Sequence, residues 1–215
     1  MKRGVFIFLL LIFIVACGPY IWFKVPQPEG KENLKEFPTE LQGKYHSALD
    51  TVIIVIYPDK IIRKYRENLA MTQKEFKNET GDTLSKDTSF MFSDNWHISI
   101  QSSGDSVKIF SSKDEEVFHI SERQLLREYN GYYFLNYKDT NNYWKVKVLR
   151  VEKDSLEFDF ILDEEDVQHI RNITSIETRK DSTKKSIRYF LDPSRRELRK
   201  ILRKRASGKK YIKNH

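Results

Sequence analysis

The stretch 132–162 constrains the fold more than any other part of the sequence. Every second residue from Leu156 to Leu162 is apolar, and Glu157 and Asp159 stand between them. Such alternation is typical of a strand with one buried face and one wetter face. A polar tip and a Lys-Asp turn divide the stretch into three segments, Tyr132–Tyr137, Tyr143–Val151 and Leu156–Leu162. The sequence therefore predicts a three-stranded antiparallel meander here.

Shorter β-like segments fill most of the remaining chain. We expect a hairpin at 51–66, a strand at Trp96–Gln101, strands at Val107–Ile109 and Val117–Ile120 separated by an acidic turn at 114–116, and a last hairpin at 174–191. Roughly ten short strands at even spacing are typical of an up-and-down barrel or a sandwich. The sequence therefore predicts a mainly β fold over 37–192, either a single antiparallel β barrel or a strongly curved meander sheet.

Three short helical segments are expected beside these strands. Ser121–Glu128 has a good N-cap residue at its start, and the acids at 163–166 suit the positive end of a second helix. Asp192 and Pro193 are typical of a helix start, with an N-cap followed by proline at the first helical position. This last helix should run to about Arg205, so residues 193–215 are predicted to form a basic helix and tail.

One local motif bears on the choice of β architecture. Residues 37–45 contain a short segment suited to a helical turn, followed by Gly43, Lys44 and Tyr45. This pattern resembles the opening of lipocalin-like barrels, in which a helical turn leads to Gly-x-Trp/Tyr on the first strand. The resemblance covers nine residues, and it implies a barrel that could enclose an apolar ligand.

The positive charge of the chain is concentrated at its C-terminal end. The net charge is +7, but residues 195–215 hold ten Lys/Arg and one acid. Leu198, Ile201 and Leu202 form a narrow apolar stripe on the expected helix. Either this stripe docks on the β domain, or the helix contacts anionic lipid. The candidate lipid-contacting residues are Arg195, Arg196, Arg199, Lys200, Arg203 and Lys204.

The N-terminal end has the order of a secretory signal peptide. Lys2 and Arg3 precede an unbroken apolar run, Val5–Ala16, which is followed directly by Cys17. The tetrapeptide Ile14-Val15-Ala16-Cys17 resembles the bacterial lipobox. The resemblance implies cleavage before Cys17, the only cysteine of the chain, and attachment of lipid to its thiol. The alternative is an uncleaved transmembrane helix, Val5–Phe23, which is long enough to span a bilayer.

These features predict how the chain is arranged and where it resides. Residues 1–16 are predicted to be a signal peptide, and residues 17–36 to be an extended tether after the lipidated Cys17, because 24–36 contain two prolines, at 26 and 28, and a glycine. The first acid after Cys17 is Glu29, which favours a periplasm-facing over a surface-exposed protein. Both interpretations of the N-terminus place the chain outside the cytoplasm, so nucleic acid is not an expected partner.

No residue pattern predicts an enzyme, a cofactor or a metal site. The five histidines lack metal-ligand spacing, and the chain has no nucleophile elbow and no glycine-rich phosphate loop. Two functions remain open. The first is a membrane-anchored envelope lipoprotein that binds an apolar ligand or lipid in a β barrel. The second is a structural or interaction lipoprotein with a filled core that serves an envelope protein assembly.

Overall fold

The computed structural model describes residues 21–81, 87–92, 95–162, 166–181, 186–204 and 208–213. The fold is mainly β, as predicted, and its strands form one mixed sheet that is not closed. The described residues divide into two compact units. We call Lys64–Asp114 the insert unit and the rest the main unit.

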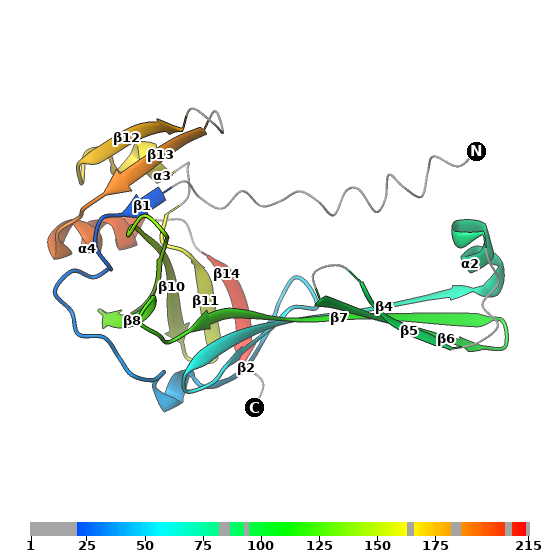
Figure 1. Ribbon diagram of the computed structural model, residues 1–215. Helices are drawn as coiled ribbons and strands as arrows, with labels where there is room; N and C mark the ends of the chain where they lie inside the picture. Colours follow the sequence, from blue (N-terminus) through cyan, green and yellow to red (C-terminus); the bar gives the residue numbers. More distant parts are fainter. Residues whose placement is uncertain are drawn as a thin grey trace. The chain divides into compact units, whose positions relative to one another are not determined.

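The predicted meander is present in the main unit. Strands β9 (Tyr132–Lys138), β10 (Trp144–Glu152) and β11 (Ser155–Phe160) pair in antiparallel order, and β8 (Gln124–Tyr129) extends them through β9. Beyond β11 the sheet continues through β14 (Lys209–Lys213), β2 (Gly43–Ser47), β3 (Ile53–Ile56), β4 (Lys60–Thr72) and β7 (Ser106–His119). Figure 1 shows β10, β11 and β14 side by side.

The two faces of β10 pack into different surroundings. Trp144, Val146 and Val148 belong to a core cluster that is covered by short elements from both ends of the chain. These elements are β1 (Ile21–Phe23), α3 (Asp166–Ile170), β12 (Ile176–Asp181), β13 (Ser186–Leu191) and α4 (Arg195–Lys204). Lys147 and Leu149 alternate onto the opposite face, because neighbouring strand residues point to opposite sides.

The opposite face, which we call the inner face, is filled by large side chains. The sheet curls, since the Tyr137 hydroxyl on β9 donates a hydrogen bond of 2.9 Å to the carbonyl of Val117 on β7. Within the described residues, no ladder joins β7 to β8, so the curled sheet is not closed. The fully buried residues of the main unit include Phe37, Leu41, Tyr45, Ile54, Ile61, Phe118, Leu126, Leu135, Leu149 and Tyr211.

The motif at Gly43–Tyr45 has the expected local structure. The 3-10 helix η2 (Thr39–Leu41) leads into β2, which begins at Gly43. Tyr45 is fully buried, and its hydroxyl donates a hydrogen bond of 2.8 Å to the carbonyl of Leu41. Since β1 precedes it, β2 is not the first strand of the chain.

The insert unit is a four-stranded sheet with one short helix. Its strand order is β4-β7-β6-β5, where β5 is Thr88–Phe92 and β6 is Trp96–Ser103. Helix α2 (Gln73–Thr80) begins with a capping box between Thr72 and Glu75. Phe76 of this helix is buried, as is Val107 of β7.

Two predicted elements differ from the structure. Residues 114–116 lie within the continuous strand β7 and not in a turn, because Asp114 pairs with Lys64 and Arg66 of β4. The helix predicted at Ser121–Glu128 is wrong, since Gln124–Tyr129 form β8, in which Leu126 pairs with Leu135 and is fully buried.

The ends of the described chain are also more ordered than the sequence predicts. Residues 21–36 do not form an extended tether, because Ile21 and Phe23 are buried and β1 pairs in parallel with β13. The sheet is therefore mixed and not purely antiparallel. Lys209–Lys213 do not form a free tail but strand β14, which lies between β11 and β2 because Tyr211 contributes a buried ring.

Candidate functional site

The predicted lipidation site lies outside the described residues, together with the whole of Ile14–Cys17. The first described residue is Ile21, whose backbone pairs with Tyr189 of β13. Residues 21–23, which the uncleaved-helix alternative includes, therefore belong to a strand. In the described part of the chain, no helix has the length and apolar content needed to cross a membrane.

The segment after β1 is held by a buried polar clamp on the meander. The backbone N–H of Gln27 donates to the side-chain oxygen of Asn136 at 2.6 Å, and the Asn136 amide donates back to the Gln27 carbonyl at 2.7 Å. Arg127 donates to the carbonyls of Pro26 and Pro28 at 2.6 and 2.9 Å. The segment 24–28 is thus fixed to the domain and does not act as a spacer.

The basic helix α4 begins two residues later than expected. Ser194 and Glu197 form a reciprocal capping pair, in which the Ser194 N–H donates to the Glu197 carboxylate at 2.8 Å and the Glu197 N–H donates to the Ser194 hydroxyl at 3.4 Å. Ser194 is therefore the N-cap in place of Asp192. Hydrogen bonding to Ser194 lowers the pKa of Glu197, which keeps this carboxylate ionised at the helix N-terminus.

The apolar stripe of α4 docks on the domain. Leu198 and Ile201 are fully buried and Leu202 is nearly so, all within the core cluster that also contains Ile21 and Phe23. This stripe is therefore not available to insert into a membrane. The six candidate cations are exposed, and one of them, Arg199, donates a hydrogen bond of 2.7 Å to the Tyr129 hydroxyl.

The inner face holds an ionisable group that the sequence analysis did not single out. The Lys147 ammonium lies 4.7 Å from the ring centre of Phe160, 5.4 Å from that of Phe158 and 5.8 Å from that of Tyr137. Arg63 lies 5.9 Å from the Phe158 ring and forms an ion pair with Glu115 at 3.6 Å. Burial, followed by the nearby Arg63 cation, lowers the pKa of Lys147 to about 8.

Little in the sequence indicates that Lys147 and Asn136 are buried. Lys147 occupies a position that alternates with Val146 and Val148, where a polar residue is ordinary on a wet strand face. Only the curling of the sheet turns that face inward. Asn136 likewise interrupts an aromatic strand, and its partner Gln27 is 109 residues away.

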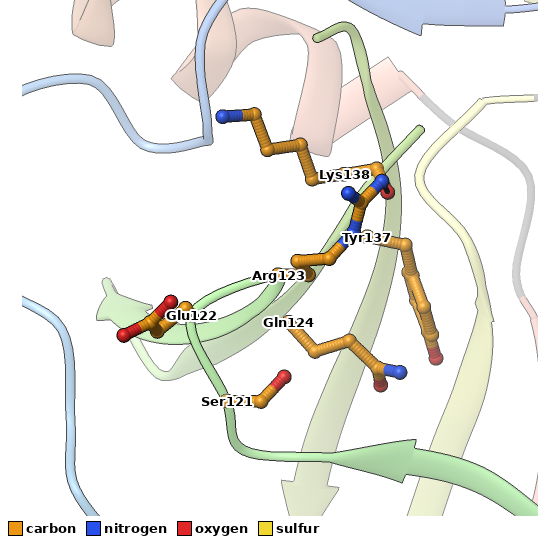
Figure 2. A pocket seen from close by; sticks show the side chains of 6 residues that line it. All are labelled: Ser121, Glu122, Arg123, Gln124, Tyr137 and Lys138. Atoms are coloured by element: carbon orange, nitrogen blue, oxygen red, sulfur yellow. Dashed lines mark hydrogen bonds between the residues drawn. The ribbon is translucent and has the colours of Figure 1, made fainter. Parts of the chain in front are cut away.

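The surface around the turn before β8 contains a depression of about 570 Å³. Its lining residues are polar or amphipathic, namely Ser121, Glu122, Arg123, Gln124, Tyr137 and Lys138. Figure 2 shows that their charged and hydroxyl groups point in different directions. Arg123 donates to the carbonyl of Asp139 at 2.9 Å, and Gln124 accepts from the His119 N–H at 2.9 Å. These groups therefore stabilise a turn, and their arrangement contains no pair of nucleophile and base.

The histidines within the described residues are not gathered into a metal site. His119 lies 3.5 Å from the carboxylate of Asp59 and 3.4 Å from that of Glu116, on the exposed side of β7. Across the described ranges, no group of three or more His, Cys, Asp or Glu side chains is placed to hold a metal ion.

Comparison with known proteins finds no matching family model, no matching curated protein and no matching solved structure.

Proposed function

We propose that this chain is a lipid-anchored envelope protein whose β domain serves as an interaction module of an envelope assembly. The role as an interaction module is supported by the filled inner face of the sheet. The proposal of an anchor rests on the lipobox-like run that ends at Cys17. The β domain binds the protein partners, and the lipid on Cys17 holds this domain at the membrane.

The side chains that fill the inner face argue against a barrel that binds a ligand inside it. A pocket for a small apolar ligand has a volume of about 300–1,000 Å³ and a mostly apolar lining. The inner face is instead occupied by rings such as those of Phe37, Phe118 and Tyr137. Phe118 stands edge-on to Phe37 at 5.9 Å and to Tyr137 at 5.3 Å between ring centres. This packing supports the interaction module over the ligand-binding barrel.

The short distance between Cys17 and β1 supports a close approach to the membrane. Four Cα steps separate Cys17 from the buried residue Ile21, and a fully extended chain covers at most about 14 Å over four steps. A lipidated Cys17 would therefore hold the main unit against the head groups. The exposed cations of α4, which packs in the same core cluster as Ile21, suit a surface of anionic lipid.

Metabolic labelling tests the anchor. Cells that express the chain are grown with radiolabelled palmitate, and the protein is isolated from the membrane fraction. The wild-type chain should carry the label, and Cys17→Ser should lose it, because no other cysteine can accept the lipid. Ser47→Ala, which keeps Cys17, is the matched control. Equal labelling of Cys17→Ser, or no labelling of the wild-type chain, contradicts the proposal.

A second candidate function rests on Lys147. In a lipocalin-like barrel, Lys147 and Arg63 would provide two cations on the inner face for the head group of an anionic amphiphile. Binding of a fluorescent fatty acid tests this candidate. Lys147→Gln should weaken binding about tenfold or more, whereas Lys44→Gln, at an exposed position of β2, should not. Absence of binding by the wild-type chain removes this candidate and leaves the interaction module.

A further inference from the structure

Among the described strands, β12, β5 and β8 lie at edges of the sheet, and the first two have opposite chemistry. The described strand order begins at β12 and ends at β5, and in the described residues each of these strands pairs with one neighbour. An edge strand presents unpaired N–H and C=O groups that are free to pair with another chain. Native proteins usually protect such an edge with charged residues, proline or a bulge.

The edge at β12 is protected and the edge at β5 is not. Four of the six residues of β12 are charged, namely Glu177, Arg179, Lys180 and Asp181. Strand β5 has the sequence Thr-Ser-Phe-Met-Phe over 88–92, with no charge and no proline. The difference within one sheet indicates that the β5 edge is open to pairing.

The side chains of β5 are exposed on both faces of the strand. Phe90 is 41% exposed and Met91 is 59% exposed, and they point to opposite sides because they are neighbours on a strand. Phe90 is paired with Ile98 of β6, and Met91 is paired with His97. A strand laid along the free edge would cover Phe90 and Met91 together.

We propose that β5 pairs in antiparallel fashion with β5 of a second copy of this chain. In such a two-fold pair each residue of the strand meets a residue of the same strand, so any like charges would stand opposite each other and repel. The absence of charge over 88–92 fits this partner in particular, because a strand of a different protein places no such demand on β5. This inference stands on the edge strand alone and does not depend on lipidation of Cys17.

The register is centred on Phe90, which lies between the exposed residues Ser89 and Met91. It places Phe90 opposite the second copy's Phe90, and Ser89 opposite the second copy's Met91. The cross-strand pair of Phe90 with Ile98 then lies in line with the same pair of the second copy. The two insert units together form one eight-stranded sheet. Aromatic cross-strand pairs of this kind stabilise antiparallel sheets.

Charge substitutions at positions 89 and 91 test both the interface and its register. The full chain is purified from membranes in detergent, and its stoichiometry is measured by native mass spectrometry. The wild-type chain should be a dimer. Ser89→Lys combined with Met91→Lys places lysines opposite each other at two points and should raise the dissociation constant about tenfold or more. Ser89→Glu combined with Met91→Lys places opposite charges there and should retain the dimer.

Two controls show whether a loss of the dimer arises at the β5 edge. Ser89 and Met91 are exposed, so both double variants keep the fold, which thermal unfolding verifies. Gln101→Lys, on the inner strand β6 of the same unit, should leave the dimer unchanged. A monomeric wild-type chain would assign the edge to a different protein and overturn the proposal. A dimer that is insensitive to the Lys/Lys variant, or equally weakened by the Glu/Lys variant, also overturns it.

Discussion

At the scale of the residue, Lys147 shows how a polar side chain becomes internal when a sheet curls. Its ammonium meets three aromatic rings and lies near Arg63, which shares the Phe158 ring with it. The rings provide cation–π attraction but no hydrogen bonds, so the charged form remains poorly solvated. This explains why the pKa of Lys147 falls to about 8.

We expect Lys147→Met to raise the free energy of unfolding at pH 7 by about 1–2 kcal/mol, because the charged form no longer has to be buried. A lysine in the unfolded chain has a pKa of about 10.4. Between about pH 8 and that value the folded state loses its proton first, so the wild-type chain becomes more stable as pH rises. The advantage of the variant should therefore shrink over this range.

Urea unfolding at pH 7 and pH 10 measures this difference. The control is Lys44→Met, at an exposed position of β2, which should change stability little at either pH. A variant that is less stable than wild type at pH 7 would mean that Lys147 contributes more through its contacts than its burial costs.

Asn136 makes the second prediction at this scale. Its side chain is fully buried and bonds both the N–H and the carbonyl of Gln27. Asn136→Ala should lower the free energy of unfolding by about 2–4 kcal/mol, since buried backbone groups are left unpaired. Asn141→Ala, in the exposed tip between β9 and β10, is the matched control for urea unfolding. Equal small effects would contradict a clamp role.

At the scale of the element, α4 divides its two faces between packing and surface charge. The buried stripe fixes the helix to the core, and the cations remain outside. Replacing Arg196, Lys200, Arg203 and Lys204 by Gln should weaken binding of residues 21–213 to anionic vesicles by up to about 1 kcal/mol per residue. Binding to neutral vesicles should not change. Sedimentation with vesicles measures this. Lys74→Gln with Lys77→Gln on α2 is the control, and unchanged binding after the α4 substitutions rules out the lipid contact.

Elements with local signals were predictable from the sequence. The meander, the hairpin of β3 with β4 and the hairpin of β12 with β13 follow from alternation bounded by turn residues. Strand β7 was misjudged because a contact with the distant strand β4 decides it, whereas β8 was misjudged although the turn Asn130-Gly131 to β9 is a local signal of a hairpin. The acids at 114–116 look like a turn until Lys64 and Arg66 are placed opposite Asp114, and β8 needs β9 as its partner.

At the scale of the whole molecule, both ends of the described chain enter the sheet of the main unit. Neither β1 nor β14 could be predicted, since β1 is only three residues long and β14 is mostly lysine with one buried ring. The basic helix α4 was likewise predictable only in part. The cations of α4 could be predicted from the sequence, but the docking of its stripe could not be separated from exposure, because both give the same spacing.

The place of β14 inside the sheet gives a direct prediction. Tyr211 is 2% exposed, while its neighbour Ile212 is 54% exposed. Tyr211→Ala should destabilise the protein by about 3–5 kcal/mol, and Ile212→Ala should change its stability by less than about 0.5 kcal/mol. Thermal or urea unfolding compares the two. Equal effects would mean that residues 209–213 behave as a free tail.

The central claim is that the domain is held at a membrane by lipid on Cys17. Intact mass spectrometry of the protein extracted from membranes tests it most directly. We predict a chain that begins at Cys17 and carries the added mass of a diacylglyceryl group, with further acylation at its new N-terminus. A mass equal to the unmodified 215-residue chain of 25.7 kDa would contradict the claim and favour an uncleaved anchor.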